Sequence, residues 1–509
     1  MGLGTIVMLV AALTFVLVGL SKAGKQAFDL EEYTVSRNQI GGSMALATVT
    51  ASALGAWILF SPAEAGSDPY FGGIAAILGY CVGSAAAVFV FVFVGPRLRQ
   101  IMPWGHSLNE YVRHRFSQRV SQQGTLETTQ NNTLNNTWGQ AMYLLTVAVM
   151  LLYMFVYLAA ELTAIAQALQ IIADVPLVVT ATVVITAVFL YTTAGGLKAT
   201  ILTDALQFVL IVPLLLICFA ATIVLLGGFG AAFAPVAEKL PEMLSLGNIP
   251  SLRFGATLII AIIAAELFNQ GNWQRVYACR DNQTVRRSFL GSSLVILPLL
   301  FLSGLLGLIA AGFELSGTTA FFDLLQTLSI PTWLPAAVVL LAVALVMSSL
   351  DTLLNGISAV FTVDLLRLSN QPRQVLLISR VLTILVGIPA VAIASQGISV
   401  LYLFFVADLI CAALLVPIIF SFYSRYQTAA NAFFSAIAGI IIGVLFFPKP
   451  DFTPLVAVPG GGDLLNSFAA ALVVSTAITL VWHTIDKSFR NKSVVPFNYS
   501  DLQRVKPYS

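Results

Sequence analysis

Six polar side chains recur along the mostly apolar stretch 341–365, and their types are those that bind small cations. They follow one another at roughly three- and four-residue steps, which on an α-helix places them along one face: Ser348, Asp351, Thr352, Asn355, Ser358 and Thr362. Hydrocarbon cannot solvate such a face, so it must point into a protein interior or a wet cavity. A carboxylate beside hydroxyl groups offers hard oxygen ligands, which suit a cation such as sodium. The alternative is a polar stripe that only holds helices together, as Ser and Thr commonly do in membranes.

The elements that must position this stripe are membrane-spanning helices. The chain has 509 residues, of which 58% are hydrophobic and 9% charged, and its mean hydropathy of +0.91 excludes an ordinary soluble domain. Apolar runs of about twenty residues recur from end to end, and each can cross a bilayer as a helix. We count about thirteen such runs, between residues 3–20 and residues 464–483. The sequence therefore predicts an all-α polytopic membrane protein.

The distribution of positive charge predicts the orientation in the membrane. With the N-terminus outside, the outer loops contain only Lys239, Arg253 and Lys449, and the other 22 of the 25 Lys and Arg face the cytoplasm. This bias favours a plasma or inner membrane protein with the N-terminus outside and the C-terminus in the cytoplasm. The first run lacks the charged start and cleavage site of a signal peptide, so we expect a retained helix. The four cysteines show no metal or disulfide spacing.

Two further segments stand out before residue 120. Residues 42–66 combine many small and hydroxylated residues with Pro62, which is typical of a broken helix whose freed carbonyls can bind an ion at mid-membrane. Close helix packing through small residues is the alternative. Residues 106–116 resemble a surface helix on the cytoplasmic face, with His106 solvated or facing the membrane.

Two polar segments lie later in the chain. Residues 266–275 contain four amide side chains, which both donate and accept hydrogen bonds and so suit a neutral or zwitterionic solute. Arg275, at the end of this segment, is expected to mark the cytoplasmic boundary. Asp204 follows a cytoplasmic turn formed by two glycines and Lys198; taken alone, it could simply cap the next helix.

Three stretches together resemble the sodium:solute symporter family. Residues 194–207, AGGLKATILTDALQ, are similar to its Gly-Gly-Leu-Lys-Ala…Thr-Asp-x-x-Gln signature. Residues 269–275, NQGNWQR, resemble its Asn/Asp-Gln-x-x-x-Gln-Arg motif, and residues 347–355, MSSLDTLLN, resemble its Met-Ser-Ser/Thr-x-x-Ser-x-Leu-Asn segment. The resemblance covers residues 30–425. It implies a LeuT-type core of two inverted repeats of five helices each.

The resemblance also implies a division of the chain and a set of ion ligands. The expected parts are an N-terminal helix and link (1–41), a first repeat (42–226), an outer loop (227–254), a second repeat (255–423), two peripheral helices (424–483) and a cytoplasmic tail (484–509). The family's main sodium site corresponds to Ala51, Leu54, Leu345, Ser348 and Ser349. A second sodium site, present in some members, corresponds to Asp204, Ser348, Asp351 and Thr352.

Residue types and the resemblance suggest where the solute binds. The substrate candidates are Ser52, Trp57, Glu161, Asn269, Asn272, Trp273 and Tyr402. Asn269 matches a substrate contact of the family's sugar carriers, whereas Ala53 stands where proline carriers have an aspartate, which argues against proline. The tryptophan of residues 273–275, WQR, also occurs in urea carriers, so urea is weakly favoured over amino acids or carboxylates.

The sequence thus predicts a transporter and not an enzyme: a sodium-coupled carrier that takes up a small polar solute by alternating access. We expect it to act as a monomer in the bilayer, with no nucleic-acid partner. A proton-coupled carrier, in which Asp204 or Asp351 relays a proton, remains the main alternative. A passive channel is a further rival. A membrane sensor is less favoured because the chain ends shortly after the last predicted helix.

Overall fold

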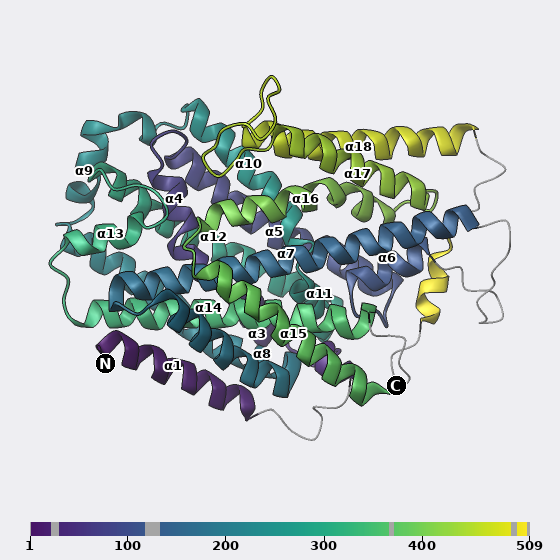
Figure 1. Ribbon diagram of the computed structural model, residues 1–509, viewed down its shortest axis with the longest axis horizontal. Coiled ribbons are helices and arrows are strands. Elements are labelled where there is room, and N and C mark those ends of the chain that lie inside the picture. Colours follow the sequence, from purple (N-terminus) through teal and green to yellow (C-terminus); the bar gives the residue numbers. More distant parts are fainter. Residues whose placement is uncertain (1, 22–29, 118–132, 366–370, 490–495, 506–509) are drawn as a thin grey trace.

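The computed structural model describes residues 2–21, 30–117, 133–365, 371–489 and 496–505. Within these ranges the regular structure is helical, apart from two isolated β-bridges. The long helices run side by side along the long axis of the molecule (Figure 1). The apolar runs of the sequence explain this architecture, because a helix satisfies its own backbone hydrogen bonds in hydrocarbon. The helices that form the long body of the molecule are α1 (Leu3–Leu20), α3 (Gly42–Ala53), α4 (Ser61–Ser67), α5 (Ile74–Ile101), α7 (Thr133–Ala173), α8 (Leu177–Leu225), α10 (Ile249–Glu266), α11 (Gln270–Ala278), α12 (Asn282–Gly312), α14 (Trp333–Ala359), α15 (Pro372–Ala394), α16 (Val400–Ser421), α17 (Ala429–Phe446) and α18 (Leu464–Phe489).

The number of membrane crossings agrees with the prediction. Eleven described helices are long and apolar enough to span a bilayer, and α3 with the segment 56–67 forms a bent pair that supplies a twelfth. Helix α8 supplies the thirteenth, because its 49 residues would span about 73 Å if straight, more than twice the hydrocarbon thickness of about 30 Å. The all-α polytopic fold is confirmed.

Helix α8 turns back on itself at Gly196. The backbone there has φ 56° and ψ −148°, a conformation that glycine adopts without the steric cost of a Cβ. Tyr191 and Thr203, on either side of the turn, both donate to Oδ2 of Asp351 on α14, over 2.8 and 3.1 Å. Lys198, next to the turn, pairs with Glu32 of α2 (Leu30–Thr34). The two glycines of the sequence motif thus make the predicted turn, and Asp204 lies two turns inside the second half of α8 instead of capping it.

Two helices are broken in the middle of the molecule. Helix α3 ends at Ala53; Leu54 and Gly55 are extended, and the chain resumes as the 3₁₀ helix η2 (Ala56–Leu59) and α4, with a bend of 58°. Helix α10 ends at Glu266 and α11 starts at Gln270, capped by the side chain of Asn269. Backbone groups at such breaks lack helical partners and must find others.

Helix α14 carries the polar stripe and lies at the centre of the bundle. Of its most apolar 18-residue window, 89% is buried, against 28–61% for the other candidate spans. It contacts α3, η2, α7, α8 and α11, so it meets both broken helices. The stripe therefore points into protein on all sides, as an unsolvated polar face requires.

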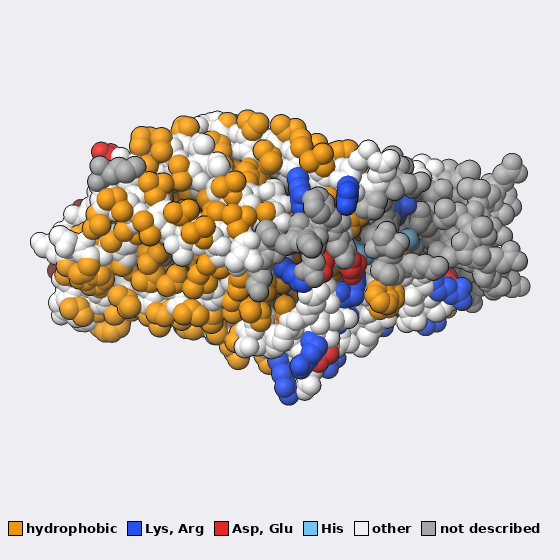
Figure 2. All heavy atoms as spheres, turned by 90° about the horizontal axis from the view of Figure 1, so that it is seen from below, with side chains coloured by type: hydrophobic (Ala, Val, Ile, Leu, Met, Phe, Trp, Pro, Cys, Tyr) orange, Lys and Arg blue, Asp and Glu red, His pale blue; other side chains and the backbone are white. Residues whose placement is uncertain are grey.

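The charged residues separate to the two ends of the molecule. Figure 2 shows hydrophobic side chains over most of one half of this face, with Lys and Arg gathered toward the other. The three basic residues predicted outside stay together: Lys239 pairs with Glu314, Arg253 pairs with Asp463, and Lys449 lies in the loop after α17. Helices α9 (Phe229–Lys239) and α13 (Ala320–Thr327) lie at this end, opposite α6 (Leu108–Phe116) (Figure 1).

The prediction of a surface helix at residues 106–116 is wrong in one respect. Helix α6 forms there, but seven of its nine residues are buried and it packs on α7. His106, expected in solvent or lipid, is also buried, and its ring nitrogens contact Glu31 (2.5 Å) and Glu110 (3.1 Å). Glu31 and Glu110 bind the imidazole of His106, so that side chain needs no water.

Candidate ion and solute sites

The polar stripe of α14 meets the first broken helix at one buried carboxylate. Asp204 accepts hydrogen bonds from Thr48 on α3 (Oδ2, 2.5 Å) and from Ser348 on α14 (Oδ1, 2.5 Å). Thr48 lies one turn before Ala51 and the break. The hydroxyl groups near Ser348 are therefore held against the end of α3, as the predicted main sodium site requires.

Asp204 also forms an ion pair with Arg275. The guanidinium Nη2 lies 2.7 Å from Oδ2 of Asp204, and both side chains are completely buried. Arg275 also donates to Thr48 (2.9 Å), to Thr352 (2.7 Å) and to the carbonyl of Gly271 (3.1 Å). The prediction that Arg275 marks the cytoplasmic boundary is wrong. Because α11 starts directly after the break, its second turn still lies inside the bundle.

We call Thr48, Asp204, Arg275, Ser348 and Thr352 the Arg275 cluster. Three of the four residues predicted for a second sodium site belong to it, and the fourth, Asp351, binds Tyr191 and Thr203 next to it. The structure brings this predicted set together. However, the oxygens of Asp204 and Thr352 bind a guanidinium, so the set does not form an open cation site.

The main predicted sodium ligands surround the break after α3. Ala51, Leu54 and Leu345 are buried and offer backbone carbonyls, while Ser349 donates within α14 to the carbonyls of Leu345 (3.3 Å) and Val346 (3.1 Å). Hard oxygen atoms of the broken helix and of the α14 stripe are therefore both present beside the break after α3.

Glu161 of α7 lies beside the break after α3. Its Oε2 accepts a hydrogen bond from the backbone N–H of Ala56, the first residue of η2, over 2.8 Å. The carboxyl also interacts with Ser349 of α14. Gly55 makes room for it, because a Cβ at that position would lie 1.6 Å from Oε1 of Glu161. A substrate candidate by sequence, Glu161 therefore lies at the predicted sodium site.

At the second break, two amide side chains bind Glu266, a residue that the sequence did not single out. Asn272 donates to its Oε2 over 2.7 Å and Asn269 over 3.3 Å, while Asn269 also caps α11. These two substrate candidates therefore direct their amides at a carboxylate. A carboxylate inside an apolar span is itself the signal that could have identified Glu266.

The remaining candidates separate into two groups. Trp57 lies just after the first break, is partly exposed and stacks on Tyr80 with ring centroids 5.6 Å apart; Ser52 lies just before the break. By contrast, Trp273 is buried against Phe91 and donates to the carbonyl of Leu267. Tyr402 donates to the carbonyl of Pro448 in the loop after α17. Trp273 thus binds the backbone of the second break, whereas Tyr402 binds the loop after α17.

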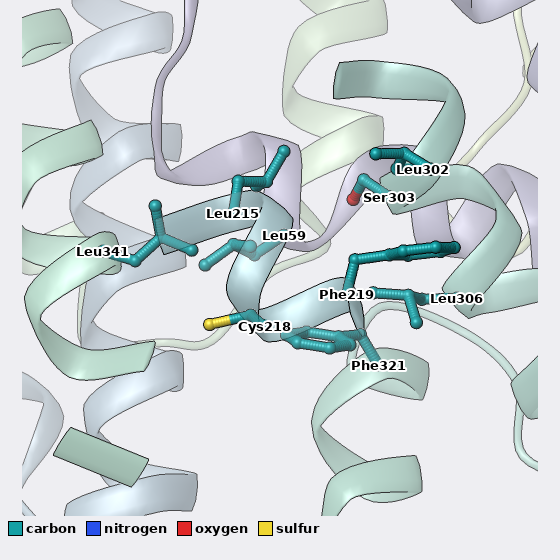
Figure 3. Close-up of a pocket in the computed structure, with 9 residues that line it drawn as sticks. All are labelled: Leu59, Leu215, Cys218, Phe219, Leu302, Ser303, Leu306, Phe321 and Leu341. Atoms are coloured by element: carbon teal, nitrogen blue, oxygen red, sulfur yellow. The ribbon is translucent and has the colours of Figure 1, made fainter. Parts of the chain in front are cut away.

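An apolar pocket lies elsewhere in the bundle and suits no polar solute. Its lining comes from η2, α8, α12, α13 and α14, and the nine residues drawn in Figure 3 are Leu59, Leu215, Cys218, Phe219, Leu302, Ser303, Leu306, Phe321 and Leu341. The hydroxyl of Ser303 is its one polar side-chain group and already donates to the carbonyl of Ile58. None of the predicted ion or substrate residues lines this pocket.

The comparisons with known proteins agree with this geometry. A model of the sodium:solute symporter family matches residues 33–439. The chain belongs to that family. Among its relatives, the spermidine transporter of Candida albicans is 26% identical over 443 residues, which cover 84% of this chain and 77% of the relative. The urea active transporter of Saccharomyces cerevisiae is 24% identical and covers 87% of this chain and 62% of the relative.

Other members and solved structures extend the likeness. The sodium/mannose cotransporter of Bos taurus is 27% identical over 303 residues, 50% of this chain and 51% of the relative. A Na⁺-coupled sialic acid symporter in its substrate-bound outward-open state superposes with a TM-score of 0.72 at 17% identity, covering 94% of this chain and 98% of that one. Mhp1, in an inward-facing conformation, gives 0.53 at 14% identity, over 93% and 97%. This symporter family member therefore has the LeuT-type transporter fold, and its family and structural neighbours are transporters, not enzymes.

Proposed function

We propose that this protein is a secondary active transporter that couples the inward movement of sodium to the uptake of a small polar organic solute. The observation that carries the proposal is Asp204, which accepts hydrogen bonds from both Thr48 and Ser348. It joins the broken helix of the first repeat (42–226) to the stripe of the second (255–423). An ion bound between such elements biases the equilibrium between outward-open and inward-open states.

Sodium is proposed to bind the carbonyls of Ala51, Leu54 and Leu345 and the hydroxyls of Ser348 and Ser349. Glu161 supports this assignment, because its carboxyl group interacts with Ser349 and Ala56, and a cation bound there would favour its charged form. With the cytoplasm negative, each sodium ion that enters gains about 2.3 kcal/mol per 100 mV. This gain can drive the solute against its gradient.

Arg275 is proposed to replace a second sodium ion. Its guanidinium binds Asp204 and Thr352, two of the four residues of the predicted second site, and so neutralises that carboxylate permanently. One sodium ion would then accompany each solute molecule. The reversal potential of uptake currents measures this ratio, and a value for two sodium ions per solute would contradict it.

The orientation is proposed from the charge distribution. Lys239, Arg253 and Lys449 lie at the end that would face outward, and Lys198 with its partner Glu32 lies at the end that would face the cytoplasm. The protein would reside in the plasma membrane with its N-terminus outside. Cysteines substituted for Lys239 and for Lys198, and labelled in whole cells, test the assignment.

The decisive experiment is uptake by the purified chain in proteoliposomes. The relatives suggest the solutes to compare, namely urea, spermidine and mannose, to which amino acids and carboxylates are added. We expect an inward sodium gradient to accelerate uptake of at least one of them, and an equal potassium gradient not to do so. Uptake that ignores sodium for every transported solute would refute sodium coupling.

Proton coupling is the second candidate, favoured by one observation. Asp351 is buried, and its carboxylate accepts hydrogen bonds from the hydroxyls of Tyr191 and Thr203 without a basic partner among the described residues. Such a carboxyl can carry a proton. Uptake in sodium-free buffer, driven by a pH gradient, would support this candidate and count against the first.

A further inference from the structure

Four aromatic rings line the region between the two breaks. Trp57 stacks on Tyr80 and meets Phe404 of α16 edge-on, with ring centroids 5.6 and 6.2 Å apart. Phe404 in turn packs on Tyr157 of α7, at 4.3 Å. Trp57 and Tyr157 are partly exposed although they lie in the middle of the bundle. The faces of such rings attract cations, because their π-electrons are negative.

Carboxyl groups surround these rings. Asp408 accepts a hydrogen bond from the hydroxyl of Tyr157 over 3.0 Å, and it lies within electrostatic range of Glu266. Tyr80 is within similar range of Asp408, Glu64 and Glu161. We call Trp57, Tyr80, Tyr157, Phe404, Glu266 and Asp408 the aromatic-acidic site.

In the described structure these carboxyls form no ion pair, and Glu266 lies within electrostatic range of Arg275. Among the described residues, no Lys, Arg or His forms an ion pair with Glu64, Glu161, Glu266 or Asp408. Asp408 is only 2% exposed, and in the described structure its Oδ2 accepts no hydrogen bond. Oε1 of Glu266 is equally free, because both amides donate to Oε2. A buried carboxyl group without a basic partner is either protonated or balanced by a cation that binds beside it.

The acids are also spread along the transport axis. Oε1 of Glu64 accepts from Ser399 at the start of α16, and Asp408 lies nine residues further along that helix, roughly 13 Å away at 1.5 Å per residue. The second oxygen of Glu64, Oε2, is buried without a partner. Phe404, and Trp57 against it, lie between these two carboxyls. The region can therefore accept positive charge at two or more points, which are separated by an apolar stretch.

We infer that the aromatic-acidic site binds an aliphatic cation that carries at least two ammonium groups. The ammonium groups would bind the free oxygens of Asp408, Glu266 and Glu64, and the methylene chain would pack on Trp57 and Phe404. A neutral solute such as urea cannot supply this charge. The inference rests on the proposed function, since it names the class of solute for the same site.

The test uses the purified full chain in proteoliposomes with an inward sodium gradient and radiolabelled 1,4-diaminobutane. We expect saturable uptake that unlabelled diaminobutane inhibits at least tenfold more potently than 1,4-butanediol, which has the same length without charge. Asp408→Asn and Glu266→Gln should each raise the half-maximal diamine concentration at least tenfold. Glu314→Gln, an exposed acid at the outer end, is the matched control and should leave it unchanged.

The possible outcomes distinguish a failure of this inference from a failure of the proposed sodium symport. Sodium-driven uptake of urea or mannose that diaminobutane does not inhibit would overturn the inference and leave symport standing, as would equal inhibition by butanediol. Diamine binding to the detergent-solubilised protein without uptake would support the inference and refute symport. If Asp408→Asn fails to fold, Glu266→Gln and the competition in the unmodified protein still decide the question.

Discussion

Two buried clusters of this transporter differ in how their negative charge is balanced. In the Arg275 cluster, the carboxylate of Asp204 binds a guanidinium of the protein itself, over 2.7 Å. In the aromatic-acidic site, Glu266 and Asp408 bind only amide and hydroxyl groups. Both clusters lie where a broken helix meets intact helices. We therefore expect the first to be a permanent structural joint and the second to be completed by the charge of a bound solute.

The strongest test of this comparison removes one charge from each cluster. Arg275→Met leaves Asp204 buried and uncompensated, and breaking such a pair costs about 3–5 kcal/mol. We expect a large fall in the thermal unfolding midpoint in detergent. Asp408→Asn removes a carboxyl without a basic partner and should be neutral or stabilising.

The double variant Arg275→Met with Asp204→Asn serves as the control for the charge itself. It should recover part of the lost stability, because no unpaired charge remains. If Arg275→Met were as stable as the unmodified protein, or Asp408→Asn the less stable of the two, the contrast between the clusters would be lost.

Gly55→Ala tests the contact between Glu161 and the first break. Its Cβ would lie 1.6 Å from Oε1 of Glu161, so the carboxyl must leave the sodium site or the break must widen. We expect sodium-driven uptake to fall at least tenfold. Gly41→Ala, at a position with nothing within 4 Å of the added Cβ, should retain uptake. Normal uptake by Gly55→Ala would show that the closeness of Glu161 to the break has no role in transport.

Substitution of two adjacent serines distinguishes ion binding from the structural joint. Ser349→Ala should raise the sodium concentration for half-maximal uptake about tenfold, which corresponds to about 1.4 kcal/mol. Ser348→Ala should do the same and also destabilise the protein, because it removes a hydrogen bond to the charged Asp204, worth about 1.5–3 kcal/mol. An unaltered sodium dependence in both variants would discredit the sodium site.

The smallest expected effect concerns pH at the end opposite α9 and α13. Burial lowers the pKa of His106, but hydrogen bonds and charges from Glu110 and Glu31 outweigh this and raise it above the ordinary value of 6.5. The imidazolium therefore stabilises the fold fully below about pH 6.5. This contribution is lost as the pH rises through the higher folded pKa.

Thermal unfolding between pH 6 and 9 measures the effect. The midpoint should fall with rising pH in the unmodified protein, and it should fall less in His106→Gln. A steeper fall in the variant would contradict the assignment. Because His106 contacts neither cluster, sodium-driven uptake at one pH should differ little between the two proteins.

Much of the architecture could be predicted from local sequence. The apolar runs predicted thirteen crossings, because each run of that length has only the helix as a stable state in hydrocarbon. The glycines before Lys198 predicted the turn in α8, and the small residues before Pro62 predicted the break after α3. The three motifs predicted the family that the comparisons identify.

The candidate site was only partly accessible to the same reasoning. Asp204, Ser348 and Thr352 were expected together and are together. Arg275 was misplaced, because its distance from the preceding apolar run suggested the membrane surface. The break before α11 keeps it inside the bundle. Trp273 looked equivalent to Trp57 by type, yet Trp57 faces Phe404, whereas Trp273 packs on Phe91 and donates to Leu267 in the second break.

The sequence alone therefore determined the helical membrane fold, the position of the first broken segment and the face of α14 that must avoid lipid. These follow from hydropathy and period, which are properties of a single helix. Only the tertiary structure decided which carboxylate receives Arg275 and which remain without positive charge. These contacts join residues far apart in the chain: Arg275 and Asp204 are 71 positions apart, and Tyr157 and Asp408 are 251 apart. No local pattern records which of several buried acids a folded chain brings next to a base.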